Sequence, residues 1–479
     1  MTWDDLLRIA PELVLTVAAC VVLLQDAWVT GPVLESEARG PAGTWIALAA
    51  VCVALVVNAR PVEGPGGAFG GMYVRDHLTR IIDFAALAAA GLGVLLSPGY
   101  VQRARLPAGE YYALLLLSTV GAMLMGASRN LVVLFLGLEI LSFPLYVMAA
   151  LARRSELSQE AGLKYLLLGA FATAFFVYGI ALIYGATGTV DLARIAEAPV
   201  SPLLGAGVAL LTIGLGFEAA LVPFHAWAPD VYEGAPLPVT AFMSVIAKVG
   251  AFAGLVRVFP LALPHLEPAW GQVLAAIAVA TMITGNLAAL VQSNVKRLLA
   301  YSSVAHAGYL LIGIASGGAD GTWAVLFYLL VYVAMNLGAF GVLLLLERRG
   351  EEADRLEDLA GLAGRAPWAA AALALCMVSL AGLPPTAGFI AKLYLFRAAL
   401  LDHRTGLALV GVLTSVVSVY YYLRVAYVAL SGGAADAVAV RRSALAGAAL
   451  VIAVAGVLWL GLFPAAVTAA VQQAVAALR

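Results

Sequence analysis

The sequence predicts an all-α integral membrane protein with about fourteen transmembrane helices. Of its 479 residues, 63% are hydrophobic and only 11% are charged, whereas roughly a quarter of the residues in soluble domains are charged. A chain of this length and composition cannot hide its apolar residues in one soluble core. The formal net charge of −1 indicates neither a nucleic-acid-binding protein nor a polybasic lipid-binding segment.

A transmembrane helix needs about 20 mostly apolar residues. Runs of this kind, bounded by charges, glycine or proline, occur at 9–29, 42–58, 78–97, 110–126, 129–151, 160–185, 202–226, 238–259, 269–292, 298–316, 322–346, 369–400, 406–430 and 444–467. No basic segment precedes the first run, so we expect a retained helix and not a cleaved signal peptide.

The distribution of Lys and Arg among the loops predicts the orientation in the membrane, because these residues are enriched in cytoplasmic loops. Here the bias favours both termini on the outer, periplasmic side. The polar stretch 347–365 would then lie in the cytoplasm. Its leucines, Leu356, Leu359 and Leu362, alternate with charges, which predicts a short amphipathic helix on the membrane surface.

The seventh and twelfth runs are predicted to be broken helices. The seventh contains Pro223, and the twelfth contains Pro384 and Pro385. Proline removes a helix hydrogen bond, and in the membrane the freed backbone must line a wet cavity or be buried in protein. Two broken helices in corresponding places are typical of inverted-repeat transporters, although proline is also common in ordinary membrane helices.

These breaks predict two inverted five-helix repeats within a four-part organisation. The parts are residues 1–105 with helices 1–3, 106–262 with helices 4–8, 263–432 with helices 9–13, and 433–479 with helix 14.

Several ionisable residues lie inside apolar runs, where a charge costs roughly 2.5–3.5 kcal/mol at a helix centre. They are Glu139, Glu218, Lys248 and Lys392, together with Lys164 and His306 nearer to helix ends. A proton relay is one explanation, because burial disfavours the charged form of such groups and brings their titration towards neutral pH. Alternatively, the carboxylates and amines form structural pairs, Lys164 extends to the membrane surface, and His306 is only hydrogen-bonded.

Five motifs resemble the antiporter-like membrane subunits of bacterial NADH–quinone oxidoreductase (complex I), the subunit N family in particular. They are LGLEILSFPLYV at 136–147, VPFHAWAPDVYEGAP at 222–236, QSNVKRLLAYSSVAHAGY at 292–309, LAGLPPTAGFIAK at 380–392 and YYYLR at 420–424. The resemblance extends over nearly the whole chain and implies a fourteen-helix, proton-translocating subunit in a bacterial plasma membrane. It assigns key roles to Glu139, Lys248 and Lys392, and matches Lys164 to a lysine common in helix six.

One position departs from the family pattern. The family has Gly-Phe-Lys before Val-Pro-Phe-His, whereas this chain has Glu218 in place of the lysine. We expect Glu139 and Glu218 to share compensation from Lys164 and Lys248, with one carboxyl protonated, because two nearby carboxylates resist ionising together. The predicted order of transfer is from Glu139 through Glu218, Lys248 and His306 to Lys392.

The resemblance implies a membrane subunit without redox chemistry of its own. Cys20, Cys52 and Cys376 lie in apolar runs without a CxxC pair, so they are interpreted as small hydrophobic residues. No cofactor or metal is expected in this chain, and NADH, FMN, iron–sulfur clusters and quinone are expected in partner subunits. The partners would be neighbouring antiporter-like and small membrane subunits. A sodium/proton antiporter subunit and a non-pumping structural subunit are the alternatives.

Overall fold

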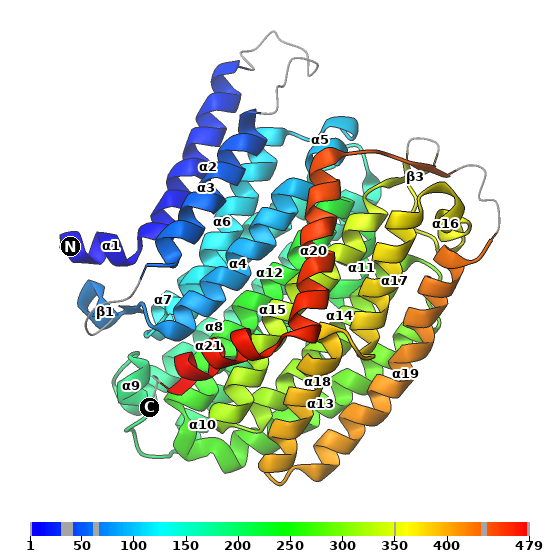
Figure 1. Ribbon diagram of the computed structural model, residues 1–479. Helices are drawn as coiled ribbons and strands as arrows, with labels where there is room; N and C mark the ends of the chain where they lie inside the picture. The colour runs from blue at the N-terminus through cyan, green and yellow to red at the C-terminus, as the bar shows by residue number, and fades with distance from the viewer. Residues whose placement is uncertain (1, 30–41, 61–66, 349–350, 433–437, 477–479) are drawn as a thin grey trace. The chain divides into compact units, whose positions relative to one another are not determined.

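The computed structural model describes residues 2–29, 42–60, 67–348, 351–432 and 438–476, and most of them are helical (Figure 1). In this part of the chain, eleven helices are long and apolar enough to cross a membrane. Three shorter apolar helices are Ala42–Asn58, Pro202–Glu218 and Pro367–Ala381. Together the long and the shorter apolar helices of the described residues number fourteen, as predicted. The predicted all-α membrane fold is therefore confirmed. The boundaries of the four predicted parts and their inverted-repeat relationship stay predictions.

The chain forms two compact units. Unit 1 comprises residues 1–219, 246–268 and 473–479, as far as these are described. Its helices are α1 (Trp3–Arg8), α2 (Ala10–Val29), α3 (Ala42–Asn58), α4 (His77–Leu96), α5 (Pro98–Arg103), α6 (Ala108–Ala127), α7 (Leu131–Ala149), α8 (Glu156–Thr187), α9 (Leu192–Ile195) and α10 (Pro202–Glu218). Strands β1 (Gly67–Ala68) and β2 (Tyr73–Val74) form an antiparallel pair around the 3-10 turn η2 (Phe69–Gly71).

Unit 2 comprises residues 220–245 and 269–472. Its elements are α11 (Trp227–Gly234), α14 (Val295–Ala315), α15 (Gly318–Leu343), α16 (Leu362–Arg365), α17 (Pro367–Ala381), α18 (Ala387–Leu401), α19 (Thr405–Leu430), α20 (Ala444–Leu462), β3 (Leu346–Arg348), β4 (Glu351–Glu352), β5 (Val438–Val440) and η5 (Leu356–Leu359). Helices α12 (Leu237–Val256), α13 (Glu267–Leu290) and α21 (Ala465–Ala476) contribute to both units, and the turns η3 (Arg257–Ala262) and η4 (Pro264–Leu266) belong to unit 1.

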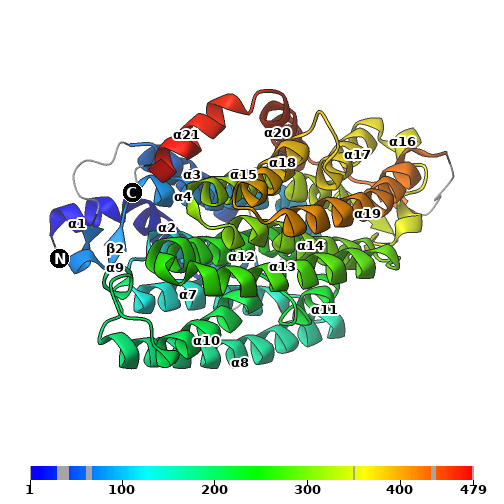
Figure 2. The ribbon, with the colours of Figure 1, turned by 90° about the horizontal axis from the view of Figure 1, so that it is seen from below.

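Glycines allow close packing of the helices that position the candidate residues of unit 1. Helices α2, α3, α4 and α6 lie side by side in Figure 1, and α8 runs along α10 in Figure 2. A Cβ atom at Gly121 of α6 would lie 2.6 Å from the Cα atom of Leu141 in α7. Only glycine permits this approach, which fixes α7 and its Glu139 against α6.

Both predicted helix breaks are confirmed. Helix α10 ends at Glu218, and the chain turns through Pro223 before α11 begins at Trp227. Helix α17 ends at Ala381, and α18 begins at Ala387. The Val222–Pro223 and Pro384–Pro385 peptide bonds are both cis.

The prediction of an amphipathic surface helix within 347–365 is wrong for the described residues of this stretch. Strand β3 pairs with β4 and also with β5, far along the chain. The 3-10 helix η5 and the one-turn helix α16 follow, and Leu356, Leu359 and Leu362 are buried in the protein. The spacing of the three leucines does not reveal that η5 and α16 pack against α19, which follows later in the chain. The side of the membrane on which this stretch lies stays a prediction.

Candidate functional site

Glu218 is the last residue of α10 and is only 2% exposed. Its Oε2 atom accepts a hydrogen bond from the Ser142 hydroxyl of α7 at 2.8 Å. Its Oε1 atom has no hydrogen-bond partner among the described residues. The carboxyl group is therefore desolvated and only half satisfied, which is costly for an ionised group.

Lys248 of α12 interacts electrostatically with Glu218, but the two form no ion pair within 4.0 Å in the described chain. Its Nζ atom donates instead to the carbonyl oxygen of Ala219 at 3.5 Å. In an unbroken helix that oxygen would accept from the residue four positions later. That residue is Pro223, which has no N–H, so the helix break supplies the acceptor for Lys248.

Glu139 and Glu218 belong to one electrostatic cluster. Glu139 interacts electrostatically with Glu218, and both carboxyl groups interact electrostatically with the Tyr146 hydroxyl. Glu139 is half-buried on α7, and its Oε1 atom accepts from the Thr173 hydroxyl of α8 at 2.7 Å. Lys164 forms an ion pair with Glu160, four residues earlier on α8, at 2.7 Å. The predicted sharing of Lys164 between Glu139 and Glu218 stays a prediction.

His306 lies at the centre of a hydroxyl network in unit 2. The fully buried ring contacts the Tyr328 hydroxyl through Nδ1 at 2.5 Å and the Tyr422 hydroxyl through Nε2 at 2.9 Å. The Tyr422 hydroxyl also forms a 2.5 Å hydrogen bond with the Ser302 hydroxyl, in which either group can be the donor. Hydroxyl and imidazole groups can each donate and accept, so such a chain can pass a proton.

A second polar chain in the same unit leads to Lys392. Tyr421 donates to Asn286 at 3.0 Å, and Asn286 donates to the Tyr309 hydroxyl at 3.1 Å. The Lys392 ammonium lies 4.8 Å from the centre of the Tyr309 ring, a cation–π distance. The rings of Tyr421 and Tyr422 are also in contact, tilted at 49° with their centres 4.4 Å apart.

Lys392 is 3% exposed and binds the end of the broken helix α17. Its Nζ atom donates to the carbonyl oxygens of Leu380 at 3.1 Å and Ala381 at 2.9 Å, and to the Ser415 hydroxyl at 2.9 Å. The helical partners of those two carbonyls would be Pro384 and Pro385, which have no N–H.

The two broken helices therefore share one feature. Their prolines leave backbone carbonyl oxygens without a helical N–H donor, and a buried lysine donates hydrogen bonds to these oxygens. Among the ion pairs of the described residues, none within 4.0 Å brings a carboxylate to Lys392. Its charge is balanced by backbone dipoles at a helix C-terminus. The ammonium is thus bound by neutral groups alone, and no carboxylate of the described residues holds its proton in place.

Sequence reasoning found the charges but missed the hydroxyl groups that bind them. The missed residues are Ser142, Thr173, Asn286, Ser302, Tyr309, Tyr328, Ser415, Tyr421 and Tyr422. Tyrosine inside an apolar run resembles packing, although a buried tyrosine hydroxyl usually needs a partner. The run of three tyrosines at 420–422 was the available signal.

Comparisons with known proteins identify the family of this chain. The model of a family described as "NADH:quinone oxidoreductase/Mrp antiporter, TM" matches residues 128–418. NADH-quinone oxidoreductase subunit N of Trichlorobacter lovleyi is 44% identical over 477 residues, which cover 98% of this chain and 96% of that protein. The chain belongs to the NADH-quinone oxidoreductase subunit N family. All the residues predicted for the relay lie within the region that the family model matches.

Solved structures show the same fold for this member of the subunit N family. A chain of respiratory complex I from Thermus thermophilus with bound aureothin is 37% identical, with a TM-score of 0.81, over 96% of this chain and 98% of that one. A chain of the Mrp complex from Dietzia sp. DQ12-45-1b also has a TM-score of 0.81, over 100% and 98% of the two chains. At 24% identity, the second likeness concerns the fold alone.

Proposed function

We propose that this chain is a proton-translocating, antiporter-like membrane subunit of a respiratory NADH–quinone oxidoreductase, an enzyme of the translocase class. NADH oxidation and quinone reduction occur in partner subunits, which hold the NADH, FMN, iron–sulfur clusters and quinone. This chain contributes the proton path. Its partners are the neighbouring antiporter-like and small membrane subunits in a bacterial plasma membrane. The loop distribution of Lys and Arg supports both termini on the periplasmic side.

The observation that carries this proposal is the environment of Lys392. The ammonium is buried and bound by two helix-end carbonyls and one hydroxyl, with no carboxylate within 4.0 Å in the described chain. A structural lysine in an apolar interior is normally ion-paired. A lysine held only by neutral acceptors can exist in both protonation states, which is the requirement for a proton carrier.

Each unit contributes one segment of the proposed relay. In unit 1 the proton passes from Glu139 to Glu218 and then to Lys248, with Ser142 and Lys164 as supporting groups. In unit 2 it passes from His306 to Lys392. A change of charge in a neighbouring subunit would act first on Glu139, because Glu139 is half-buried whereas Glu218, the other carboxyl of the relay, is buried.

Proton pumping by the assembled complex tests the proposal when it is measured together with NADH–quinone electron transfer. Lys248→Ala and Lys392→Ala should each lower the number of protons pumped per electron. Arg154→Ala removes an exposed cation of unit 1 and serves as the control with unchanged pumping. Undiminished pumping in both lysine variants would favour the non-pumping structural subunit, an alternative that the reversed charge of Glu218 supports.

A sodium/proton antiporter subunit is the second candidate, because the matched family includes Mrp antiporters. Vesicles containing the assembled complex distinguish the two. Pumping that persists in sodium-free buffer supports proton transfer alone, whereas pumping that requires sodium supports the antiporter.

A further inference from the structure

Helices α2 and α4 each bury a carboxyl group in unit 1, outside the region 128–418 that the family model matches. Glu12, in the first turn of α2, is 2% exposed, and Asp83, in the second turn of α4, is 0% exposed. The Tyr73 hydroxyl donates to Glu12 Oε1 at 2.9 Å. None of these residues belongs to the relay described above.

Most of the carboxyl oxygens in this pair lack a hydrogen bond. Both oxygens of Asp83 and the Oε2 atom of Glu12 are buried and have no hydrogen-bond partner among the described residues. The strongest charge interaction of Asp83 is with Glu12. Two ionised carboxylates that interact in this way, buried and largely without donors, would be strongly destabilising.

The Arg75 guanidinium forms no ion pair within 4.0 Å with either carboxylate in the described chain. The Arg75 guanidinium donates to the carbonyl oxygens of Arg8 at 2.8 Å and Val57 at 3.2 Å, and to Asn58 Oδ1 at 3.5 Å. It interacts with Glu12 and Asp83 only over a longer range. Arg75 is therefore fixed by neutral acceptors.

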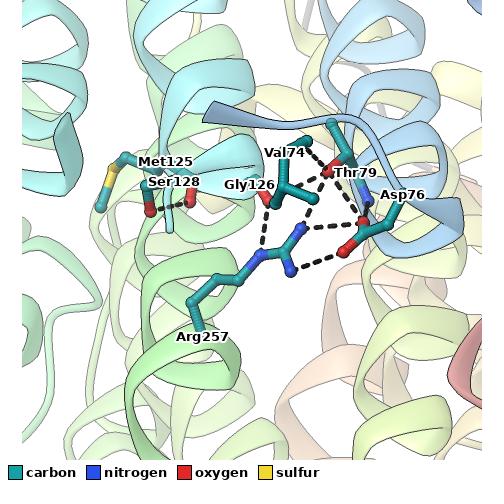
Figure 3. Close-up of polar contacts among 7 residues, drawn as sticks. All are labelled: Val74, Asp76, Thr79, Met125, Gly126, Ser128 and Arg257. Atoms are coloured by element: carbon teal, nitrogen blue, oxygen red, sulfur yellow. Dashed lines mark hydrogen bonds and ion pairs between the residues drawn. The ribbon is translucent and has the colours of Figure 1, made fainter. Parts of the chain in front are cut away.

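The next cation is already occupied by another carboxylate. Arg257 binds both oxygens of Asp76, at 2.7 and 2.8 Å, and also donates to the carbonyl oxygen of Gly126 at 2.8 Å (Figure 3). This ion pair neutralises itself. The Arg8 guanidinium is paired with Asp4 at 3.0 Å. The charges that remain are then Glu12 and Asp83 against Arg75, an excess of one negative charge.

The Tyr73 phenol does not remove this excess. Burial and the charge of Glu12 raise the pKa of Tyr73 well above its ordinary value. Tyr73 is therefore a neutral donor, and the charged or titratable groups around the pair are Tyr73, Arg75, Asp76 and Arg257.

We propose that Glu12 and Asp83 form a second proton-binding site, in which one of the two buried carboxyl groups is protonated. The bound proton removes the excess charge. A metal cation fits less well, because the Arg75 guanidinium repels it. In addition, no group of three or more His, Cys, Asp or Glu residues within the described ranges could hold a metal.

Infrared difference spectroscopy of the assembled complex between neutral and alkaline pH tests this site. The wild-type complex should show the carbonyl stretch of a buried protonated carboxyl that shifts in D₂O. Asp83→Asn and Glu12→Gln should each abolish it, because the remaining carboxylate then balances Arg75 and ionises. Glu197→Gln, which removes an exposed carboxyl of unit 1, should leave the band unchanged.

Three results would overturn the proposal. The first is a wild-type complex without the band. The second is a band that persists in Asp83→Asn or in Glu12→Gln. The third is a band that appears only when sodium is omitted, which would show that the pair binds sodium. If one variant fails to assemble, the other still decides, because either substitution alone should abolish the band.

Discussion

The Lys392 ammonium donates a hydrogen bond of 2.9 Å to the carbonyl oxygen of Ala381, the oxygen that Pro385 is unable to bind. The adjacent carbonyl of Leu380 has the same relationship to Pro384. Lys248 binds the carbonyl of Ala219, which Pro223 leaves free, at the longer distance of 3.5 Å. Proline breaks in this fold thus create acceptor sites for lysines at membrane depth, and the proposed relay depends on them.

Gly382→Ala should displace the Lys392 side chain. Gly382 has a φ of +80°, and a Cβ atom there would lie 2.7 Å from Lys392 Cδ. A left-handed residue other than glycine costs about 1–2 kcal/mol, and the lysine stem must also shift. We expect a lower thermal unfolding temperature and fewer protons pumped per electron. Gly406→Ala, where nothing lies within 4 Å of the new Cβ, should change neither, and equal effects at both positions would contradict this account.

Lys392→Met should destabilise the fold less than Lys296→Met. Lys296 is buried in an ion pair with Glu352 at 2.7 Å, so its replacement removes the cation that this carboxylate binds. The cost should be about 3 kcal/mol, at the low end for buried pairs because Glu352 is 21% exposed. Lys392 binds only neutral acceptors, so its replacement by methionine leaves no charge without its counter-ion and should cost less.

Thermal unfolding of the purified complex measures this difference between the two lysines. Lys296→Met combined with Glu352→Gln should recover most of the lost stability. A destabilisation by Lys392→Met as large as that by Lys296→Met would show that Lys392 is structural.

Tyr422→Phe should slow proton transfer through unit 2. It removes the hydroxyl that contacts His306 Nε2 at 2.9 Å and Ser302 at 2.5 Å, while the ring and its packing remain. We expect fewer protons pumped per electron than in wild type. Tyr420→Phe is the matched control, because Tyr420 is 64% exposed on the same helix, and it should pump normally. Normal pumping by Tyr422→Phe would exclude its hydroxyl from the path.

Acid should weaken the Asp76–Arg257 ion pair. Burial alone would raise the pKa of Asp76, but the Arg257 guanidinium and the Thr79 donors lower it below its ordinary value. A lowered carboxyl pKa stabilises the fold above the unfolded value, about 3.9, and this contribution disappears as the pH falls through the folded value. Unfolding temperatures measured between pH 7 and pH 3 should therefore fall more steeply below about pH 4 in wild type than in Asp76→Asn. Parallel curves would contradict the role of this pair.

The sequence predicted the membrane fold well because its signals are local. Each apolar run needs only its own residues to indicate a helix, and Pro223, Pro384 and Pro385 indicate breaks wherever they occur. The same holds for Lys248 and Lys392, which are conspicuous in apolar surroundings.

What the sequence did not predict depends on contacts between distant residues. The strand at 346–348 pairs with 438–440, a distant partner that its own residues do not indicate. Ser142 reaches Glu218 across 76 positions, and Tyr422 reaches His306 across 116. The Lys164–Glu160 pair is an exception, because its i,i+4 spacing on a helix was visible in the sequence.

Lys392→Arg in the assembled complex tests the central claim most directly. Arginine keeps the positive charge and can donate to the same carbonyls, but it does not lose its proton in proteins. If Lys392 carries a proton, the number of protons pumped per electron in sealed vesicles should fall to the level of Lys392→Ala. If the lysine is only a fixed counter-charge for the end of α17, Lys392→Arg should pump as well as wild type, and that result would contradict the account.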